Sequence, residues 1–171
     1  MPRYAAFLRG VNVGGVNLKM AAVAKTFTDA GFTEVRTILA SGNVLLDSDS
    51  DAATVRTRAE RALRDAFGYE AWVLVYDLET LAAISAGYPF ERAVEGFHSY
   101  VTFVSDAAAL DELAALAPGP EEKIRRGAGV VYWQVARHAT LGSVIGKTMG
   151  KKRYKSSTTT RNLRTLEKVL R

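Results

Sequence analysis

The chain contains no cysteine at any of its 171 positions. Disulfide frameworks, thiolate metal sites, iron–sulfur clusters and thiol catalysis are therefore excluded. The sequence also lacks an apolar run of about 18 residues, the length that a membrane-spanning helix requires, and Met1 to Tyr4 show no signal-peptide pattern. We therefore expect a soluble, cytoplasmic protein with no membrane partner.

Histidine is scarce as well, with only His98 and His138, which are far apart in the sequence. Neither belongs to a pattern such as H-E-x-x-H, so the sequence indicates no metal site and no cofactor. We expect each histidine to lie at a strand end and to be satisfied by a backbone partner. The hydrophobic content of 48% and the charged content of 24% are those of a globular protein, which excludes the disordered and collagen-like classes.

Positive charge is concentrated near the C-terminus. Residues 147–171 carry nine basic residues and one acid, Glu167, so their net charge is +8, whereas that of the whole chain is +5. Five of these cations form a basic patch: Lys147, Lys151, Lys152, Arg153 and Lys155. This patch either follows the phosphates of a nucleic acid, with Tyr154 stacked on a base, or is a solvated surface that keeps the protein soluble.

The first half of the chain has the expected element order β-α-β-β-α-β. The apolar pattern predicts strands over residues 4–9, 35–40, 43–47 and 71–76, and helices over residues 20–27 and 55–67. The glycines Gly31 and Gly68 end the helices, and the short Ser41-Gly42 connection predicts a hairpin. This is the order of a ferredoxin-like unit, so we expect residues 1–77 to form a first unit.

The second half, residues 78–171, begins the same pattern again. It predicts helices over residues 78–86, 110–117 and 143–149, and strands over residues 99–104, 121–126 and 130–136. A last helix is expected from about Thr160, with the threonines 158–160 as its N-cap, so a final strand is missing. The predicted fold class is α+β: two ferredoxin-like units, the second incomplete, with a C-terminal helix packed on them. The sequence leaves open whether the protein is a monomer or a homodimer.

Candidate ligand-binding residues lie at the loops that flank the first unit's strands. In a ferredoxin-like sheet the first and third strands are antiparallel neighbours, so Arg9 and Asn12 should converge with Ser41 and Asn43 at one sheet edge. The loop of residues 10–15 either holds an oxyanion beside the Arg9 guanidinium or is a tight glycine turn, with Arg9 paired to an acid. Asn43 either serves its own turn or holds the 10–15 loop in place.

A second candidate pair, Arg161 and Asn162, is placed in the first turn of the expected last helix. A cation there opposes the helix dipole, and such a conflict with local preference is typical of functional sites. The alternative is that Arg161 packs its stem and bonds a carboxylate.

Several segments resemble a known bacterial family. They are LRGVNVGGVNLKM (8–20), ASGNV (40–44), YPF (88–90), HSYVTFVS (98–105) and TTRNLRTLEKVL (159–170). Their order and spacing are similar to those of the family catalogued as domain of unknown function 1697. The resemblance implies a duplicated ferredoxin-like α+β protein without an established activity. Tyr88 replaces the family's usual asparagine, and Val144 stands where the family has a lysine after Ser143.

The leading functional hypothesis is a binding module for an anionic ligand, either nucleic acid or a phosphorylated metabolite. The alternatives are a metal-free enzyme acting on a phosphate- or carboxylate-bearing small molecule, with Arg9 and Arg161 as electrostatic clamps, and a structural or adaptor protein. No catalytic residue is singled out by the sequence.

Overall fold

The computed structural model describes residues 1–12, 16–139, 143–149 and 151–171. The chain divides into two compact units, residues 1–82 with 168–171 (unit 1) and residues 83–167 (unit 2). The division expected from the sequence after residue 77 remains a prediction. Within the described ranges, no helix combines the length and apolarity that crossing a membrane requires.

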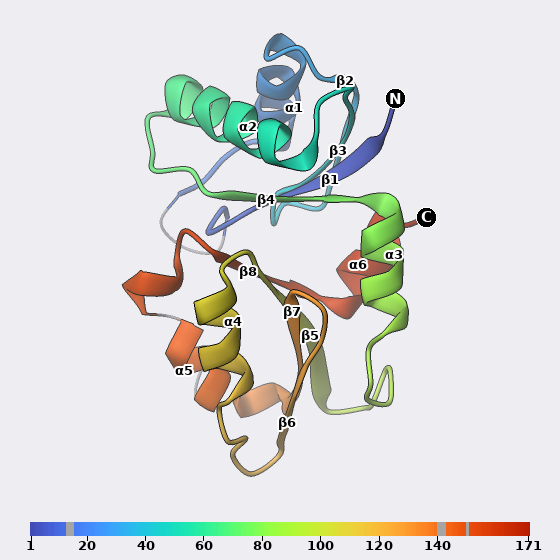
Figure 1. The fold of residues 1–171 in the computed structure, drawn as a ribbon, viewed down its shortest axis with the longest axis vertical. Coiled ribbons are helices and arrows are strands. Elements are labelled where there is room, and N and C mark those ends of the chain that lie inside the picture. The colour runs from blue at the N-terminus through green and yellow to red at the C-terminus, as the bar shows by residue number, and fades with distance from the viewer. Residues whose placement is uncertain (13–15, 140–142, 150) are drawn as a thin grey trace. The chain divides into compact units, whose positions relative to one another are not determined.

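Unit 1 is a four-stranded antiparallel sheet with two helices on one face (Figure 1). Its elements are β1 (Arg3–Leu8), α1 (Met20–Asp29), β2 (Thr33–Ile38), β3 (Asn43–Asp47), α2 (Ala52–Phe67) and β4 (Val73–Asp77), and its strand order is β2-β3-β1-β4. Alternate residues of β1, namely Tyr4, Ala6 and Leu8, pack in the core with the apolar sides of α1 and α2. The predicted β-α-β-β-α-β order of the first half is confirmed.

The helix α2 ends at Gly68 as predicted, but it begins at Ala52, three residues before the predicted start. The Asp51 carboxylate accepts a hydrogen bond from Thr54 N at 2.8 Å and so caps the first turn. Gly68 ends the helix with a φ of 66°, a left-handed conformation that glycine adopts without a steric penalty.

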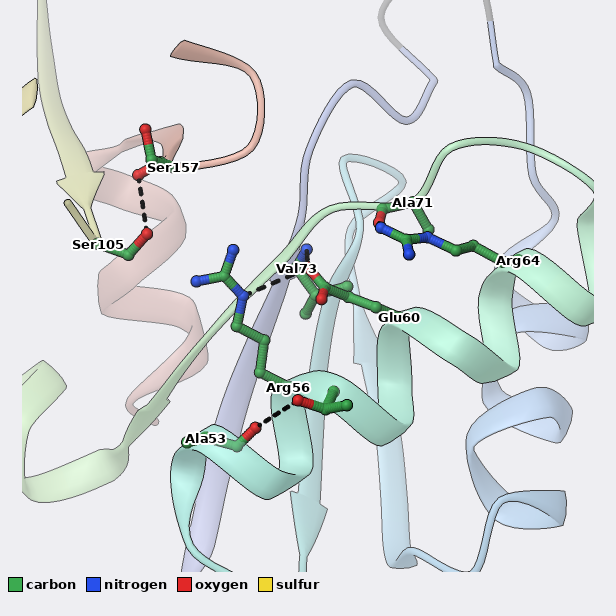
Figure 2. Close-up of polar contacts among 9 residues, drawn as sticks. Ala53, Arg56, Glu60, Arg64, Ala71, Val73, Ser105 and Ser157 are labelled. Atoms are coloured by element: carbon green, nitrogen blue, oxygen red, sulfur yellow. Dashed lines mark hydrogen bonds and ion pairs between the residues drawn. The ribbon is translucent and has the colours of Figure 1, made fainter. Parts of the chain in front are cut away.

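Side chains spaced four residues apart attach α2 to the start of β4 (Figure 2). Glu60 Oε2 accepts from Arg56 Nε at 3.3 Å and from the backbone N–H of Val73 at 3.0 Å. One turn further on, Arg64 Nη2 donates to the Ala71 carbonyl at 2.9 Å. Because this spacing places all three helix residues on one side of α2, they fix the helix against the incoming strand.

Unit 2 repeats the arrangement of unit 1. The division between the units falls within α3 (Leu78–Ala86), and the last two residues of α6 belong to unit 1. The elements after α3 are β5 (Phe97–Val104), α4 (Ala107–Ala114), β6 (Glu122–Arg126), β7 (Val130–Ala136), η1 (Arg137–Ala139), α5 (Val144–Met149), η2 (Lys152–Tyr154), β8 (Thr158–Asn162) and α6 (Leu163–Val169). The strand order is β6-β7-β5-β8, again antiparallel, and residues of α4 and α5 pack with one face of the sheet (Figure 1).

The expectation of an incomplete second unit is wrong, because Thr158–Asn162 form the strand β8 beside β5. The threonines of 158–160 were expected to cap a helix, but β-branched side chains favour extended backbone. A hydrogen bond of 2.8 Å between the hydroxyls of Thr160 and Thr102 joins β8 to β5. Figure 2 shows a further contact before β8, where Ser105 Oγ donates to the Ser157 carbonyl at 3.4 Å.

The contact between α2 and β4 generates a stability prediction. Replacing Glu60 by alanine leaves the Val73 N–H without its acceptor and removes the partner of Arg56, so we expect Glu60→Ala to lower the free energy of unfolding by about 1–3 kcal/mol. Urea denaturation followed by circular dichroism measures this change. The matched control is Asp65→Ala on the exposed side of the same helix, which should change the value by less than about 0.5 kcal/mol. Equal losses for the two variants would contradict the role assigned to Glu60.

Candidate anion-binding pocket

The two loops expected to converge in unit 1 do so. Asn12 Nδ2 donates to the Ala40 carbonyl at 2.7 Å, and Leu8 N donates to the Gly42 carbonyl at 2.9 Å. Gly42 has a φ of 88°, and a Cβ atom there would lie 2.9 Å from Leu8 Cβ. Only glycine therefore allows the hairpin to approach β1 this closely.

Both carboxamides at this corner serve the backbone. Asn12 also donates to the Leu18 carbonyl at 2.9 Å and accepts from Leu18 N at 2.8 Å. Asn43 is buried, and its Nδ2 donates to the Ile38 carbonyl at 2.8 Å and to Ser41 Oγ at 3.0 Å. Both amide hydrogens of Asn43 therefore close its own hairpin.

Arg9 is partly buried beside this corner, and burial lowers the pKa of its guanidinium below the usual value. Its backbone N–H donates to the Trp72 carbonyl at 3.0 Å. Val13, Gly14 and Gly15, the rest of the expected oxyanion loop, lie outside the described residues. A ligand-binding role for Arg9, Asn12, Ser41 and Asn43 remains a prediction.

Arg161 lies in β8 opposite Val101, so its expected place in the first turn of a helix is wrong. The residue is 6% exposed, and Nη1 donates to Thr159 Oγ1 and to the Thr160 carbonyl, both at 2.9 Å. Burial lowers the pKa of Arg161 to about 10, which leaves the group charged at neutral pH. The guanidinium is thus held inside the protein, and its proposed contact with a ligand remains a prediction.

Asn162, the next residue, lines a pocket of about 340 Å³ within unit 2. The lining combines three arginines, one acid, three other polar residues and three apolar residues. These are Arg92, Arg137, Arg164, Glu167, His98, Ser99, Asn162, Ala93, Phe97 and Leu163.

Sheet topology brings these residues together from distant parts of the sequence. Because β5 is antiparallel to both β7 and β8, its first residues lie beside the last residues of those strands at one end of the sheet. Arg137 directly follows β7, and Asn162 is the last residue of β8. The Asn162 side chain accepts from Arg164 N at 2.9 Å and so fixes the start of α6, which carries Arg164 and Glu167.

The pocket lining has a formal net charge of +2, because the described lining residues include three arginines and one glutamate. The carboxylate of that glutamate, Glu167 Oε1, lies 3.5 Å from Arg92 Nη1. Arg92 is held from a second side, since its Nη2 donates to the Ser85 carbonyl and its guanidinium lies 5.8 Å from the Tyr88 ring centroid. The Arg137 backbone N–H donates to the Gly96 carbonyl at 2.9 Å, which fixes the backbone of Arg137 at the pocket.

The corresponding edge of unit 1 is built differently. Tyr4 pairs with Asp77 in one sheet and Tyr100 pairs with Asn162 in the other, so these pairs mark equivalent positions. Just before the tyrosine, Arg3 Nη1 and Asp47 Oδ1 form a 2.8 Å ion pair.

In unit 2 the residue before the tyrosine is Ser99, whose Oγ accepts from Gln134 Nε2 at 3.2 Å. A short serine with an amide thus replaces a long arginine with a carboxylate. The fold itself therefore does not require the pocket.

A short sequence repeat marks the same equivalence. Residues 78–81 (LETL) follow Asp77, and residues 163–166 (LRTL) follow Asn162. Both four-residue segments begin a helix, α3 and α6. The glutamate of the first copy, Glu79, is replaced by Arg164 in the second. This repeat is the signal in the sequence that locates the end of β8 and the start of α6.

Of the pocket's residues, only Asn162 was among the sequence-derived candidates. Arg92, Ser99 and Arg137 were missed because they lie far from Asn162 in the sequence and only strand register brings them to it. Arg164 and Glu167 were missed although they closely follow Asn162, because the start of the last helix was misplaced. His98 lies at the start of β5, as expected of a strand-end residue, and it also lines the pocket. Its expected backbone partner stays a prediction. The other histidine, His138, lies 3.3 Å from the Glu121 carboxylate.

The residues of the basic patch are all exposed. Tyr154, between them, is 1% exposed and donates its hydroxyl to Glu112 Oε2 at 2.6 Å. The expectation that Tyr154 stacks on a base is therefore wrong, because its ring is buried among core residues of unit 2. Among the described residues, no three potential metal ligands gather in one place.

Comparison with known proteins places the chain in a family. A solved structure, described as the conserved bacterial protein SP0830 from Streptococcus pneumoniae, is similar with a TM-score of 0.81 and 21% sequence identity, over 99% of this chain and 96% of that chain. At this identity the similarity shows the fold alone. No curated protein matches the chain. Residues 1–132 match the family described as "Protein of unknown function (DUF1697)", which confirms the resemblance seen in the sequence motifs. The chain therefore belongs to the DUF1697 family.

Proposed function

We propose that the protein binds a small phosphorylated metabolite in the pocket of unit 2. The observation that carries the proposal is the convergence of Arg92, Arg137 and Arg164, from three separate segments, on one pocket. A guanidinium group presents a planar set of N–H donors that matches phosphate oxygens and stays charged at neutral pH.

The dimensions and lining of the pocket support a small ligand. Its volume of about 340 Å³ lies at the lower end of the range of roughly 300–1,000 Å³ that is usual for small-molecule sites. Phe97 and Leu163 offer apolar surface for the carbon part of a ligand, whereas His98, Ser99 and Asn162 offer polar contacts. A dianionic phosphate with several acceptor oxygens suits a lining of net charge +2 better than a single carboxylate does.

Binding is favoured over catalysis by the environment of Ser99, the hydroxyl residue in the pocket lining. Its Oγ accepts a hydrogen bond from the Gln134 amide, and an amide cannot take up the proton that a nucleophilic serine must release. Burial raises the pKa of the neighbouring Tyr88, which keeps its hydroxyl protonated.

The strand orders β2-β3-β1-β4 and β6-β7-β5-β8 support the ferredoxin-like description of both units. Many unrelated functions use this topology, so the proposal rests on the pocket and not on the fold.

The proposal predicts saturable binding of inorganic phosphate, a hexose phosphate or a nucleoside monophosphate, measured by isothermal titration calorimetry at low salt. Arg137→Gln and Arg164→Gln should each weaken binding about tenfold or more, because a charge-assisted hydrogen bond is worth about 1.5–3 kcal/mol.

The matched control is Arg125→Gln, which removes an exposed cation of unit 2 that does not line the pocket. It should leave the affinity within about twofold of the wild-type value, since exposed charges acting at a distance are largely screened. Equal weakening by all three substitutions would indicate diffuse charge attraction and contradict the proposed site.

A second candidate function, nucleic-acid binding, is favoured by the exposure of all five cations of the basic patch. The segment is anchored by the buried ring of Tyr154 and by the 3.4 Å contact between Arg153 and Glu112. The backbone that carries the lysines is thereby tied to α4, which contains Glu112.

If the basic patch contacts five phosphates of a duplex, the logarithm of the affinity should fall against the logarithm of salt concentration with a slope of about −4.5. Fluorescence anisotropy with a labelled duplex measures the slope. The double variant Lys151→Gln/Lys152→Gln should reduce it to about −2.7, whereas Lys19→Gln/Lys123→Gln, which removes two exposed lysines elsewhere, should not change it. A salt-independent affinity would exclude this function.

A further inference from the structure

One acid in the pocket runs against its overall charge. Glu167 is the sole carboxylate among the described residues that line it, beside three arginines. At the equivalent place in unit 1, five residues after Asp77, the chain has Ala82, whereas five residues after Asn162 it has Glu167. The repeated helix therefore does not need an acid at this position.

The pairing of Glu167 with Arg92 is accessible to a ligand. The two side chains are 45% and 39% exposed, and the closest distance between Glu167 Oε1 and Arg92 Nη1 is 3.5 Å. An ion pair so exposed contributes little to stability. Arg92 also donates to the Ser85 carbonyl, so it has a second contact that does not involve Glu167.

The ion pair of Arg92 and Glu167 gives the pocket a neutral polar region beside its positive charge. Three arginines and one glutamate give the described lining a formal net charge of +2, which matches a phosphate dianion. The neutral pair offers donors from the guanidinium and acceptors from the carboxylate. A hydroxyl group donates one hydrogen bond and accepts others. Neighbouring hydroxyl groups can therefore donate to the Glu167 carboxylate and accept from the Arg92 guanidinium. An apolar group would displace the water bound to both side chains and offer no hydrogen bonds in return.

On the basis of the proposed function, we infer that Glu167 and Arg92 recognise the hydroxyl groups of a phosphorylated sugar, while Arg137 and Arg164 hold its phosphate. Glu167 is then the residue that distinguishes a sugar phosphate from phosphate alone. The sugar phosphate is either free or the ribose phosphate of a nucleotide, and the two differ in the base that Phe97 would contact.

The test compares the affinities of ribose 5-phosphate, 2-deoxyribose 5-phosphate, adenosine monophosphate and inorganic phosphate for the wild-type protein and for Glu167→Gln. We expect Glu167→Gln to weaken ribose 5-phosphate about tenfold, the effect of losing one hydrogen bond to a charged group, and to leave inorganic phosphate unchanged or slightly tighter. The wild-type preference for ribose over 2-deoxyribose phosphate should shrink in the variant. The control Glu95→Gln removes an exposed acid that does not line the pocket and should change none of these values.

The outcomes separate the inference from the proposed function. If Glu167→Gln tightens both ribose 5-phosphate and inorganic phosphate to the same extent, Glu167 only repels anions and the inference is overturned. The proposed function itself fails if inorganic phosphate does not bind the wild-type protein. It also fails if inorganic phosphate binds Arg137→Gln and Arg164→Gln as tightly as it binds the wild-type protein. Tighter binding of adenosine monophosphate than of ribose 5-phosphate assigns the site to nucleotides, and the reverse order assigns it to free sugar phosphates.

Discussion

The pocket depends on the register of β5 between β7 and β8. Antiparallel pairing sets Tyr100 opposite Trp133 on one side and Asn162 on the other. Every residue near the start of β5 therefore has a defined neighbour near the ends of the other two strands. A shift of one position would turn the side chains of a strand to the opposite face of the sheet, and Asn162 would no longer lie at the pocket edge with the start of α6.

Local features of the fold were predictable from the sequence where one residue type has one strong conformational preference. Gly68 was expected to end α2 because a left-handed residue is needed there, whereas the start at Ala52, capped by Asp51, lies three residues before the predicted one. The meeting of Asn12 with the Ala40 carbonyl followed from the expected neighbours in the sheet. These predictions needed only local chemistry and one rule of topology.

The prediction failed where two local preferences compete. The threonines of 158–160 serve equally well as helix caps and as strand residues, and pairing with β5 decides for the strand. Arg161 was placed wrongly for the same reason. The pocket could not be predicted because Arg92, Arg137 and Arg164 are separated by 45 and 27 positions, and no sequence period links them. Only Asn162 was found, through its neighbour Arg161.

The two sheets of the chain carry different residues at equivalent ends. In unit 1 Arg3 and Asp47 form an ion pair at this end of the sheet, and Asp77 caps α3 through Thr80. In unit 2 Ser99 and Gln134 occupy the place of the ion pair, and arginines surround the space. A chain that contains the same sheet arrangement twice can carry different residues at equivalent positions of the two copies. Substitutions that form the pocket in unit 2 leave the ion pair of unit 1 unchanged. The second copy is therefore free to change its chemistry while the first keeps its own.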